Sequence, residues 1–104
     1  MSNAQLFSAL GDVNRLDLLS RLSPDTPRTL SQLASGAGIS RQGVRKHVQV
    51  LADANLVRLE PKGREVLIRA NPERLDEGIE MLHALTRRWQ VKLEALKSFV
   101  EEKG

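Results

Sequence analysis

The sequence predicts a mainly α-helical domain that carries one small β-hairpin, and three observations support this prediction. Four short segments and one long segment space their apolar residues at helical intervals. One stretch alternates apolar and polar residues on both sides of a turn that contains proline and glycine. The length of 104 residues suits a single domain. We therefore expect about five helices and a two-stranded hairpin within one domain, residues 1–104.

The composition restricts the classes of protein and of site. There is no cysteine, which excludes disulfides, thiolate metal sites and thiol redox switches. Aromatic residues are nearly absent, so Leu, Val, Ile and Ala must form most of the core. No apolar run is long enough to span a membrane, and the N-terminus lacks a signal-peptide pattern, so we expect a cytoplasmic protein without membrane contact. A core this small is marginally stable alone, and dimerisation would add to it.

Residues 1–28 predict two short helices and a loop. Gly11 suits a left-handed cap at the end of the first helix, and Asp12 suits the N-cap of the second helix. A loop is expected at "SPDTP", Ser23–Pro27, because two prolines stop a helix. The first helix holds Leu6, Phe7 and Leu10, and the second helix has an apolar side formed by Val13, Leu16, Leu19 and Leu22.

Residues 29–54 predict a pair of helices joined by a turn that contains glycine. Thr29 and Gln32 have the spacing of a capping box at the start of the first helix, which ends at "GAG". Ser40 is the expected N-cap of the second helix, and Asn55 suits a left-handed turn at its end. The second helix is amphipathic, with an apolar stripe formed by Val44, Val48 and Leu51.

Residues 56–70 predict the β-hairpin. Apolar residues alternate with polar ones on both sides of "EPKGR", Glu60–Arg64, which reads as a turn because it contains proline and glycine. The apolar residues that match across this turn are Val57 and Leu59 before it, and Val66 and Ile68 after it.

Residues 71–103 predict one long helix, which starts with Asn71 as N-cap, Pro72 in the first helical position and Glu73 in the first turn. Eight positions follow a 4-3-4-3 spacing, the heptad pattern of a helix that packs lengthwise on another helix. The other helices are too short to cover it, which favours a second copy of the chain. An ordinary stripe facing the core is the alternative. The eight positions are Leu75, Ile79, Leu82, Thr86, Trp89, Leu93, Leu96 and Val100.

Positive charge is concentrated in the middle of the chain. The net charge is +3. Between Ser40 and Arg69 there are seven basic and three acidic residues, which gives +4 and leaves −1 for the remainder. This asymmetry indicates a polyanionic partner.

The order of helix, turn, basic helix and basic hairpin is that of a helix-turn-helix followed by a wing. The second helix of such a motif enters the major groove of DNA. Counting 100° per residue puts the polar and cationic residues of this helix opposite or beside the apolar stripe. The alternative is a solvated helix face, but such faces usually mix both signs of charge. The expected DNA-binding residues are Ser40, Arg41, Gln42, Gly43, Arg45, Lys46 and Gln49 on the helix, with Lys62 and Arg64 on the wing.

These residue types suit different parts of DNA. Gln42 and Gln49 can both donate to and accept from base edges, with adenine as a favoured partner. Arg45 suits guanine or a phosphate, and the helix start at 40–41 suits a phosphate. Arg64 suits a narrow minor groove, which attracts arginine, or the backbone.

Two residues of the basic helix have less direct interpretations. Gly43 lies on the flank between the two faces, where a missing side chain would let the helix approach the DNA backbone or the preceding helix closely. His47 lies at the edge of the apolar stripe, and we interpret it as a packed histidine with one satisfied nitrogen rather than a ligand or a catalytic residue.

The chain resembles the ArsR/SmtB family of winged-helix repressors. The resemblance runs from "ALGDVNRLDLLSRL" through "LSQLASGAGISRQGVRKHVQVLADANLV" to "KGREVLIRANPERL", and so covers nearly the whole chain. The last helix, with "RRWQVKLEALKSFVEE", is similar to that of a subgroup whose last helix is amphipathic and contains Trp. The resemblance implies a homodimer joined through the first and last helices, which binds a two-fold-symmetric operator in double-stranded DNA and represses transcription. The expected dimer-interface residues are Leu6, Phe7, Leu10, Leu75, Ile79, Leu82, Trp89, Leu93 and Leu96.

The chain departs from the metal-sensing members of this family. The stretch "TLSQL", Thr29–Leu33, lacks their cysteines. On the last helix Asp76, Glu80 and His83 share a face without a second histidine, and we interpret this face as solvated charge. We therefore expect no metal and no cofactor. Arg45 replaces the Ser or Thr that is frequent in the family, so the resemblance gives no operator sequence.

Two other classes of function are disfavoured. A winged-helix module for protein association without DNA readout would use the heptad helix, but the purely basic face from Arg41 to Lys46 argues against it. An enzyme is disfavoured because the chain has two histidines, no cysteine and no glycine-rich phosphate loop.

Overall fold

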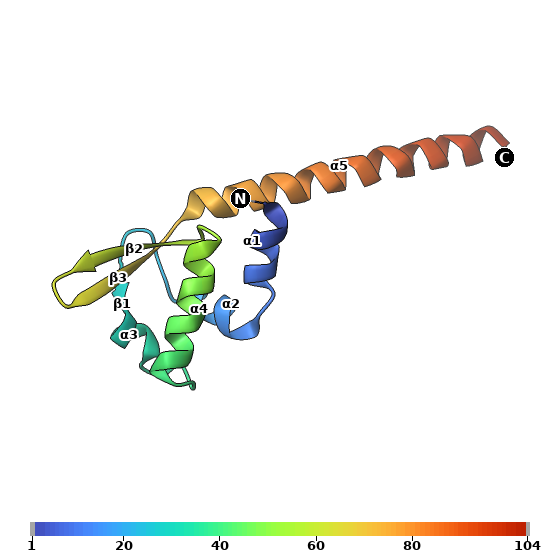
Figure 1. The fold of residues 1–104 in the computed structure, drawn as a ribbon. Helices are drawn as coiled ribbons and strands as arrows, with labels where there is room; N and C mark the ends of the chain where they lie inside the picture. Colours follow the sequence, from blue (N-terminus) through green and yellow to red (C-terminus); the bar gives the residue numbers. More distant parts are fainter. Residues whose placement is uncertain (1, 104) are drawn as a thin grey trace.

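The structure is a computed structural model that describes residues 2–103, and within them it contains five helices and a three-stranded antiparallel sheet (Figure 1). This arrangement confirms the predicted mainly α-helical fold with a hairpin. The strands lie in the order β1-β3-β2. The elements are α1 (Asn3–Leu10), α2 (Val13–Ser20), β1 (Arg28–Thr29), α3 (Leu30–Ala34), α4 (Arg41–Asp53), β2 (Val57–Lys62), β3 (Glu65–Ala70) and α5 (Pro72–Lys103).

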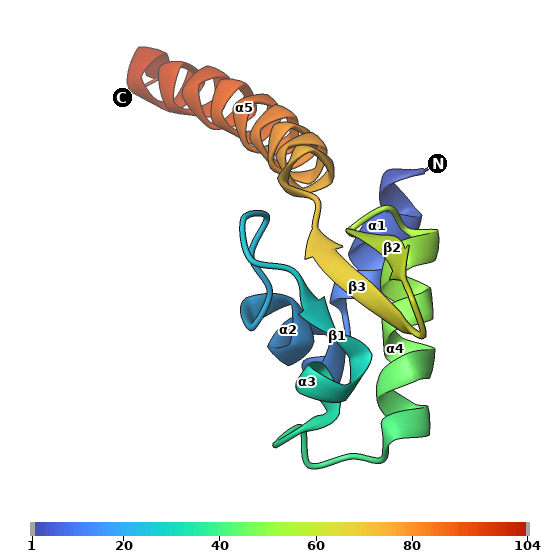
Figure 2. The same cartoon turned by 90° about the vertical axis from the view of Figure 1, so that its left-hand side faces the viewer.

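β1 is a strand that the sequence does not predict. It pairs antiparallel with β3, with Arg28 opposite Ile68 and Thr29 opposite Leu67. Two residues are too few to show an alternating pattern, so no periodicity could reveal this strand. Because Thr29 both ends β1 and caps α3, the hairpin is connected directly to the start of the helix-turn-helix (Figure 2).

Most of the predicted helix ends are confirmed. The Asp12 carboxylate accepts hydrogen bonds from two backbone N–H groups of α2, at 2.9 and 3.1 Å. Thr29 and Gln32 form both bonds of the capping box. Asn55 has φ = 62°, the left-handed turn expected after α4. These features need only neighbouring residues, which is why the sequence predicts them well.

Two predictions for the N-terminal helices are wrong. Gly11 has φ = −79°, outside the left-handed region, because the extended Asp12 makes the turn into α2. In α2 the fully buried residue is Leu18, which was not in the predicted stripe, whereas Val13 is 79% exposed and Leu16 is 51% exposed. An eight-residue helix has too few turns for its apolar spacing to fix the inner side.

The predicted turn of the hairpin, Glu60–Arg64, is too long. Its first three residues belong to β2, where Pro61 lies opposite Val66, and the chain turns at Gly63 and Arg64. β2 is an edge strand, which tolerates a proline, so this proline does not mark the turn.

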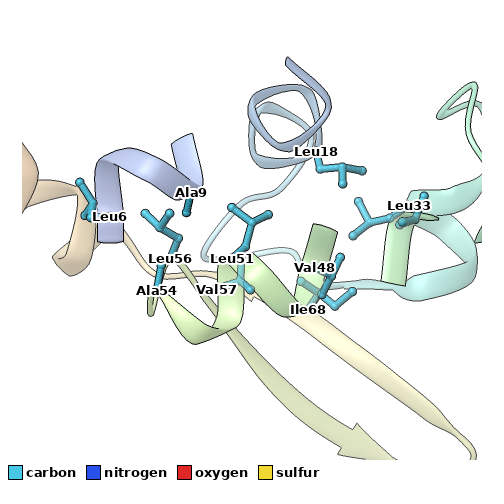
Figure 3. Packing of buried hydrophobic residues seen from close by; sticks show 11 residues of the cluster. Leu6, Ala9, Leu18, Leu33, Val48, Leu51, Ala54, Leu56, Val57 and Ile68 are labelled. Carbon is cyan, nitrogen blue, oxygen red and sulfur yellow. The ribbon is translucent and has the colours of Figure 1, made fainter. Parts of the chain in front are cut away.

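The core is built around α4. Its apolar stripe of Val44, Val48 and Leu51 is buried, which confirms the predicted inner side. α4 contacts α1, α2, α3 and β2, so the other elements of the body are arranged around it. Figure 3 shows this packing. The other buried apolar residues are Leu6, Ala9, Leu18, Leu33, Ala54, Leu56, Val57 and Ile68.

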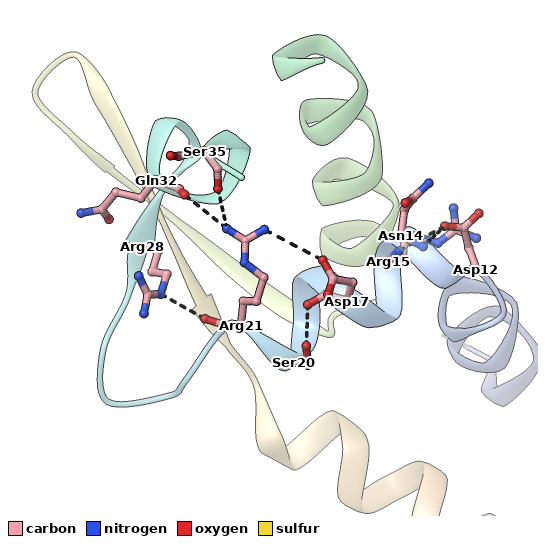
Figure 4. A network of polar contacts seen from close by, with 9 residues as sticks. All are labelled: Asp12, Asn14, Arg15, Asp17, Ser20, Arg21, Arg28, Gln32 and Ser35. Carbon is pink, nitrogen blue, oxygen red and sulfur yellow. Dashed lines mark hydrogen bonds and ion pairs between the residues drawn. The ribbon is translucent and has the colours of Figure 1, made fainter. Parts of the chain in front are cut away.

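One network of arginine hydrogen bonds joins the end of α2 to β1 and to the end of α3. Arg21 donates to the Ser35 carbonyl at 2.9 Å and to the Gln32 carbonyl at 3.5 Å, which satisfies free carbonyls at the end of α3 (Figure 4). Arg28 of β1 donates to the Arg21 carbonyl at 3.0 Å. The first helix of the helix-turn-helix is thereby fixed against the end of α2.

α5 is joined to the rest of the chain through its first turns. Gly78 permits a close crossing with α1, because a Cβ there would lie 2.9 Å from Leu6 Cδ2. Arg74 is 4% exposed, and its guanidinium donates to the Ala54 carbonyl at 3.0 Å and to the Ser2 carbonyl at 2.8 Å. It also pairs with Glu77. One buried side chain therefore connects α5 to the end of α4 and to the start of α1.

The rest of α5 projects away from the body (Figure 1). From Thr86 to Glu102 every residue is exposed, including the apolar ones. Within residues 2–103, no helix combines the length and the apolar character needed to cross a membrane.

We expect Arg74→Met to lower the free energy of unfolding by about 2–3 kcal/mol, because the buried Ala54 carbonyl and the Ser2 carbonyl would lose their donor. Urea unfolding followed by circular dichroism measures this change. Arg88→Met is the matched control, since Arg88 is exposed on the same helix and should change stability by less than about 0.5 kcal/mol. Equal losses in both variants would contradict a stabilising role for the Arg74 hydrogen bonds.

Candidate nucleic-acid interface

α4 turns its basic side to solvent. Ser40 caps the helix, and its Oγ accepts a hydrogen bond from the Gly43 N–H at 3.0 Å. The polar residues of the first two turns are exposed, while the apolar stripe is buried on the other side. The helix therefore has the two sides that a groove-reading helix needs. The exposed residues are Arg41, Gln42, Arg45 and Lys46.

A groove of about 290 Å³ lies between α4 and the hairpin, and we call it the α4–wing groove. Of the predicted DNA-binding residues, Arg41, Arg45 and Gln49 line it from α4, and Arg64 lines it from the turn of the hairpin. The structure thus brings residues from two distant segments of the sequence to one groove. The other predicted residues, Ser40, Gln42, Gly43, Lys46 and Lys62, are not among those that line it.

The arginines of this groove have no partner in the described part of the chain. Among residues 2–103, the guanidinium groups of Arg41, Arg45 and Arg64 make no hydrogen bond and no ion pair, and the same holds only for Arg88 on α5. Unpaired guanidinium groups gathered over one groove favour an anion, above all one that accepts paired hydrogen bonds, such as a phosphate or a carboxylate. The arginines with protein partners are Arg15, Arg21, Arg28, Arg58, Arg69, Arg74 and Arg87.

Sequence reasoning missed three polar residues of the groove, namely Thr29, Ser31 and Glu65. Thr29 and Ser31 lie at the start of α3, and they reach the groove because β1 pairs with β3. The sequence holds no signal for that pairing, so it could not place these hydroxyls beside the wing. Glu65 lies opposite Lys62 at the end of the hairpin.

Gln49 and His47 already have partners inside the chain. Gln49 Nε2 donates to Asp53 Oδ1 at 2.9 Å, which orients the amide along the helix. His47 is half-buried, with its Nδ1 3.3 Å from Arg15 Nη1 and 4.0 Å from Asp12 Oδ1. This contact confirms the interpretation of His47 as a packed histidine with one satisfied nitrogen.

The surroundings of Gly43 favour one of its two explanations. The atoms nearest to a Cβ at this position would be Ser40 Oγ, at 3.3 Å, and atoms of Ile39. These residues belong to the loop before α4 and not to α3, so packing against the preceding helix does not account for the glycine. A close approach to the DNA backbone stays a prediction.

The wing is braced by Arg69. Its Nε donates to Glu60 Oε1 at 2.9 Å, and its Nη1 donates to the Pro24 carbonyl at 2.7 Å. β3 is therefore tied to β2 and to the loop before β1. The Arg69 guanidinium holds the pKa of the Glu60 carboxyl below its usual value of 4.5, partial burial opposes this effect, and Arg58 adds to it.

The acidic face of α5 carries Asp76, Glu80 and His83. Glu80 is paired with Arg87, at 3.4 Å. In the part of the chain that the structure describes, no three His, Asp or Glu side chains gather closely enough to hold a metal ion, and this includes Asp76, Glu80 and His83.

Comparison with known proteins gives concordant matches. A family model described as a helix-turn-helix domain matches residues 10–60. An uncharacterized HTH-type transcriptional regulator of Bacillus subtilis, YuzN, is 37% identical over 76 residues, which are 67% of this chain and 83% of that protein. The structure of an ArsR-like transcriptional regulator from Rhodococcus sp. RHA1 is 31% identical with a TM-score of 0.84, over 93% of this chain and 91% of that chain. A winged helix-turn-helix domain from Mycobacterium bovis, described as homodimeric, is 19% identical with a TM-score of 0.64, over 80% of this chain and 77% of that chain, and this likeness shows the fold alone.

The Glu60–Arg69 pair should make the attachment of the wing sensitive to acid. The pKa of Glu60 is lower in the folded chain than in the unfolded chain. Its stabilisation is therefore fully present above about pH 4.5 and is lost as the pH falls through the lowered pKa. We expect the amide protons of β2 and β3 to lose protection against exchange, relative to those of α4, as the pH falls below about 4.5. Hydrogen exchange followed by NMR measures this loss, and Glu60→Gln should abolish its pH dependence. An unchanged pH dependence in Glu60→Gln would contradict the assignment.

Proposed function

The chain belongs to the ArsR-like family of helix-turn-helix transcriptional regulators, a family of DNA-binding proteins and not of enzymes, and we propose that it acts as a homodimeric repressor of a two-fold-symmetric operator. The observation that carries the proposed DNA surface is the set of unpartnered arginines on the α4–wing groove, Arg41, Arg45 and Arg64. Each retains its full capacity to donate to a phosphate, since no carboxylate or carbonyl of residues 2–103 occupies it.

In the proposed complex, α4 enters the major groove and the wing follows the adjacent backbone. Gln42 is exposed on the outer side of α4. Gln49 Nε2 donates a hydrogen bond to Asp53, which leaves Gln49 Oε1 free to accept one from a base. Both suit base edges. Arg45 lies where helix and wing face each other, and so it suits a phosphate as well as guanine. The wing arginine, Arg64, suits the backbone or the minor groove.

The proposed dimer rests on the open side of α5. The apolar heptad residues from Ile79 to Val100 are between 48% and 60% exposed. An apolar row of this length in water favours packing against a second helix. Leu6 is fully buried against Gly78, so its role in a dimer is to support α5 from within rather than to touch a second copy. The remaining proposed contacts on α1 and at the start of α5, Phe7, Leu10 and Leu75, are half-buried. The exposed seam residues are Ile79, Leu82, Trp89, Leu93 and Leu96.

We expect the protein to bind its own upstream DNA more tightly than a scrambled duplex, with an affinity that falls steeply with salt. Gln42→Ala and Gln49→Ala should alter the base preference, because they remove contacts to base edges. Arg64→Ala should weaken binding to all sequences alike and lower the salt slope by about one. Fluorescence anisotropy at several salt concentrations measures these effects.

Arg88→Ala is the matched control for Arg64→Ala, because Arg88 is also unpartnered but lies on α5. Its DNA affinity should stay close to that of the wild type. Equal affinity of the wild type for upstream and scrambled DNA at every salt concentration would refute the repressor proposal. An equal loss in the Arg88 and Arg64 variants would refute the proposed surface.

We expect Leu93→Glu to convert a dimer into a monomer, because a carboxylate in the apolar seam would have to be desolvated. Analytical ultracentrifugation gives the mass directly. Val91→Glu is the control, since Val91 is 69% exposed on the same helix but lies opposite the seam by helical count. A wild-type monomer at micromolar concentration, or equal dissociation of both variants, would contradict dimerisation through this seam.

A further inference from the structure

The α4–wing groove has an apolar floor, which binding of a phosphate backbone does not require. Five apolar residues contribute to its lining, from α3, α4 and both strands of the hairpin. Leu59 and Val66 of the hairpin are 38% and 39% exposed, so apolar surface is left open to the groove. Phosphates are recognised by cations and by N–H or O–H donors, and aliphatic side chains offer them no hydrogen bond. The five residues are Leu30, Val48, Leu59, Val66 and Ile68.

The rim of the same groove is cationic. Arg41 and Arg45 come from α4 and Arg64 from the turn of the hairpin, and Glu65 is the single carboxylate in the lining. The hydroxyl-bearing residues Thr29 and Ser31 stand at the α3 side. An apolar floor with a few converging polar groups is the usual composition of a small-molecule site. Here the converging groups are guanidiniums without partners, which are complementary to an acidic head group.

We propose that the α4–wing groove binds a small amphipathic carboxylic acid, and that the bound acid displaces DNA. The carboxylate pairs with the rim arginines, and the aliphatic or aromatic body lies on Leu59 and Val66. The volume of about 290 Å³ restricts the ligand to a short chain or a small ring system. Displacement rests on the proposed function, which assigns DNA contacts to Arg45 and Arg64. An acid that occupies them stabilises the DNA-free protein and lowers the apparent DNA affinity by competition.

The first test asks whether the site exists, and it needs no DNA. The full chain, labelled with ¹⁵N, is titrated with sodium octanoate, with octanol and with sodium acetate, at constant ionic strength. Octanoate should shift the amide signals of Arg45, Leu59 and Val66 in a saturable manner. Octanol lacks the charge and acetate lacks the apolar body, so neither should do this at the same concentrations. Equal shifts with acetate, or octanoate shifts confined to α5, would overturn the site.

Variants separate the groove from other apolar surfaces. Leu59→Ser and Val66→Ser should each weaken octanoate binding about tenfold, as expected when apolar contact is lost from a ligand pocket. Val91→Ser, on the exposed outer side of α5, should bind octanoate like the wild type. Two floor variants are used so that the test does not fail if one of them misfolds. The dispersion of their NMR signals reports whether each is folded. Undiminished binding in both folded floor variants would overturn the proposed floor.

The second test asks whether the acid displaces DNA. Anisotropy of labelled upstream DNA is measured first without any acid, which tests the proposed function separately. Octanoate should then raise the apparent Kd in proportion to its occupancy of the groove, whereas octanol and acetate should not. Octanoate that binds in the groove and leaves DNA affinity unchanged would overturn displacement. A protein that takes octanoate but binds no DNA would overturn both the repressor and displacement, while it supports the acid site.

Discussion

Burial of one side of α4 is the constraint on which the rest of the structure depends. Val44, Val48 and Leu51 face inward, and α1, α2, α3 and β2 all pack against this helix. Because an α-helix has fixed angular spacing, burying these three residues forces Gln42 and Lys46 outward. The same contact places the hairpin beside the helix, since Val57 and Ile68 are buried in the same core. The basic surface is therefore a geometric consequence of core packing and needs no separate stabilisation.

The arginines divide into two groups by their surroundings, those that connect parts of the chain and those without a partner among the described residues. Arg74 is enclosed by backbone carbonyls, and Arg69 by a carboxylate and a carbonyl, so both serve as connectors within the chain. The arginines of the α4–wing groove meet no such acceptor. A guanidinium holds its charge at every physiological pH and donates in a planar fork. Those left without a partner are thus available to an outside anion, whether it is a DNA phosphate or the head group of a competing acid.

The two ends of α5 differ in their contacts with the rest of the chain. Its first turns are fixed by the Leu6–Gly78 crossing and by the hydrogen bonds of Arg74, whereas its later turns carry apolar residues in water. Apolar surface on this scale favours association. If a second copy covers the seam, the relative placement of the two α4 helices follows from the crossing at Gly78. The fixed first turns would then determine the spacing at which the dimer reads DNA.

The sequence by itself determined the features that depend on neighbouring residues or on long periodic patterns. The caps at Asp12, Thr29 and Ser40, the turn at Asn55, the two sides of α4 and the presence of the hairpin are all of this kind, and so is the basic character of α4 and the wing. Only the tertiary structure decided what depends on contacts between distant segments. It added β1, turned Leu18 rather than Val13 inward, and buried Leu6 against Gly78. It also placed Thr29 and Ser31 in the α4–wing groove, together with its three arginines and its apolar floor. Short elements carry too few residues for a pattern, and a groove between two elements exists only once both are packed on the same core.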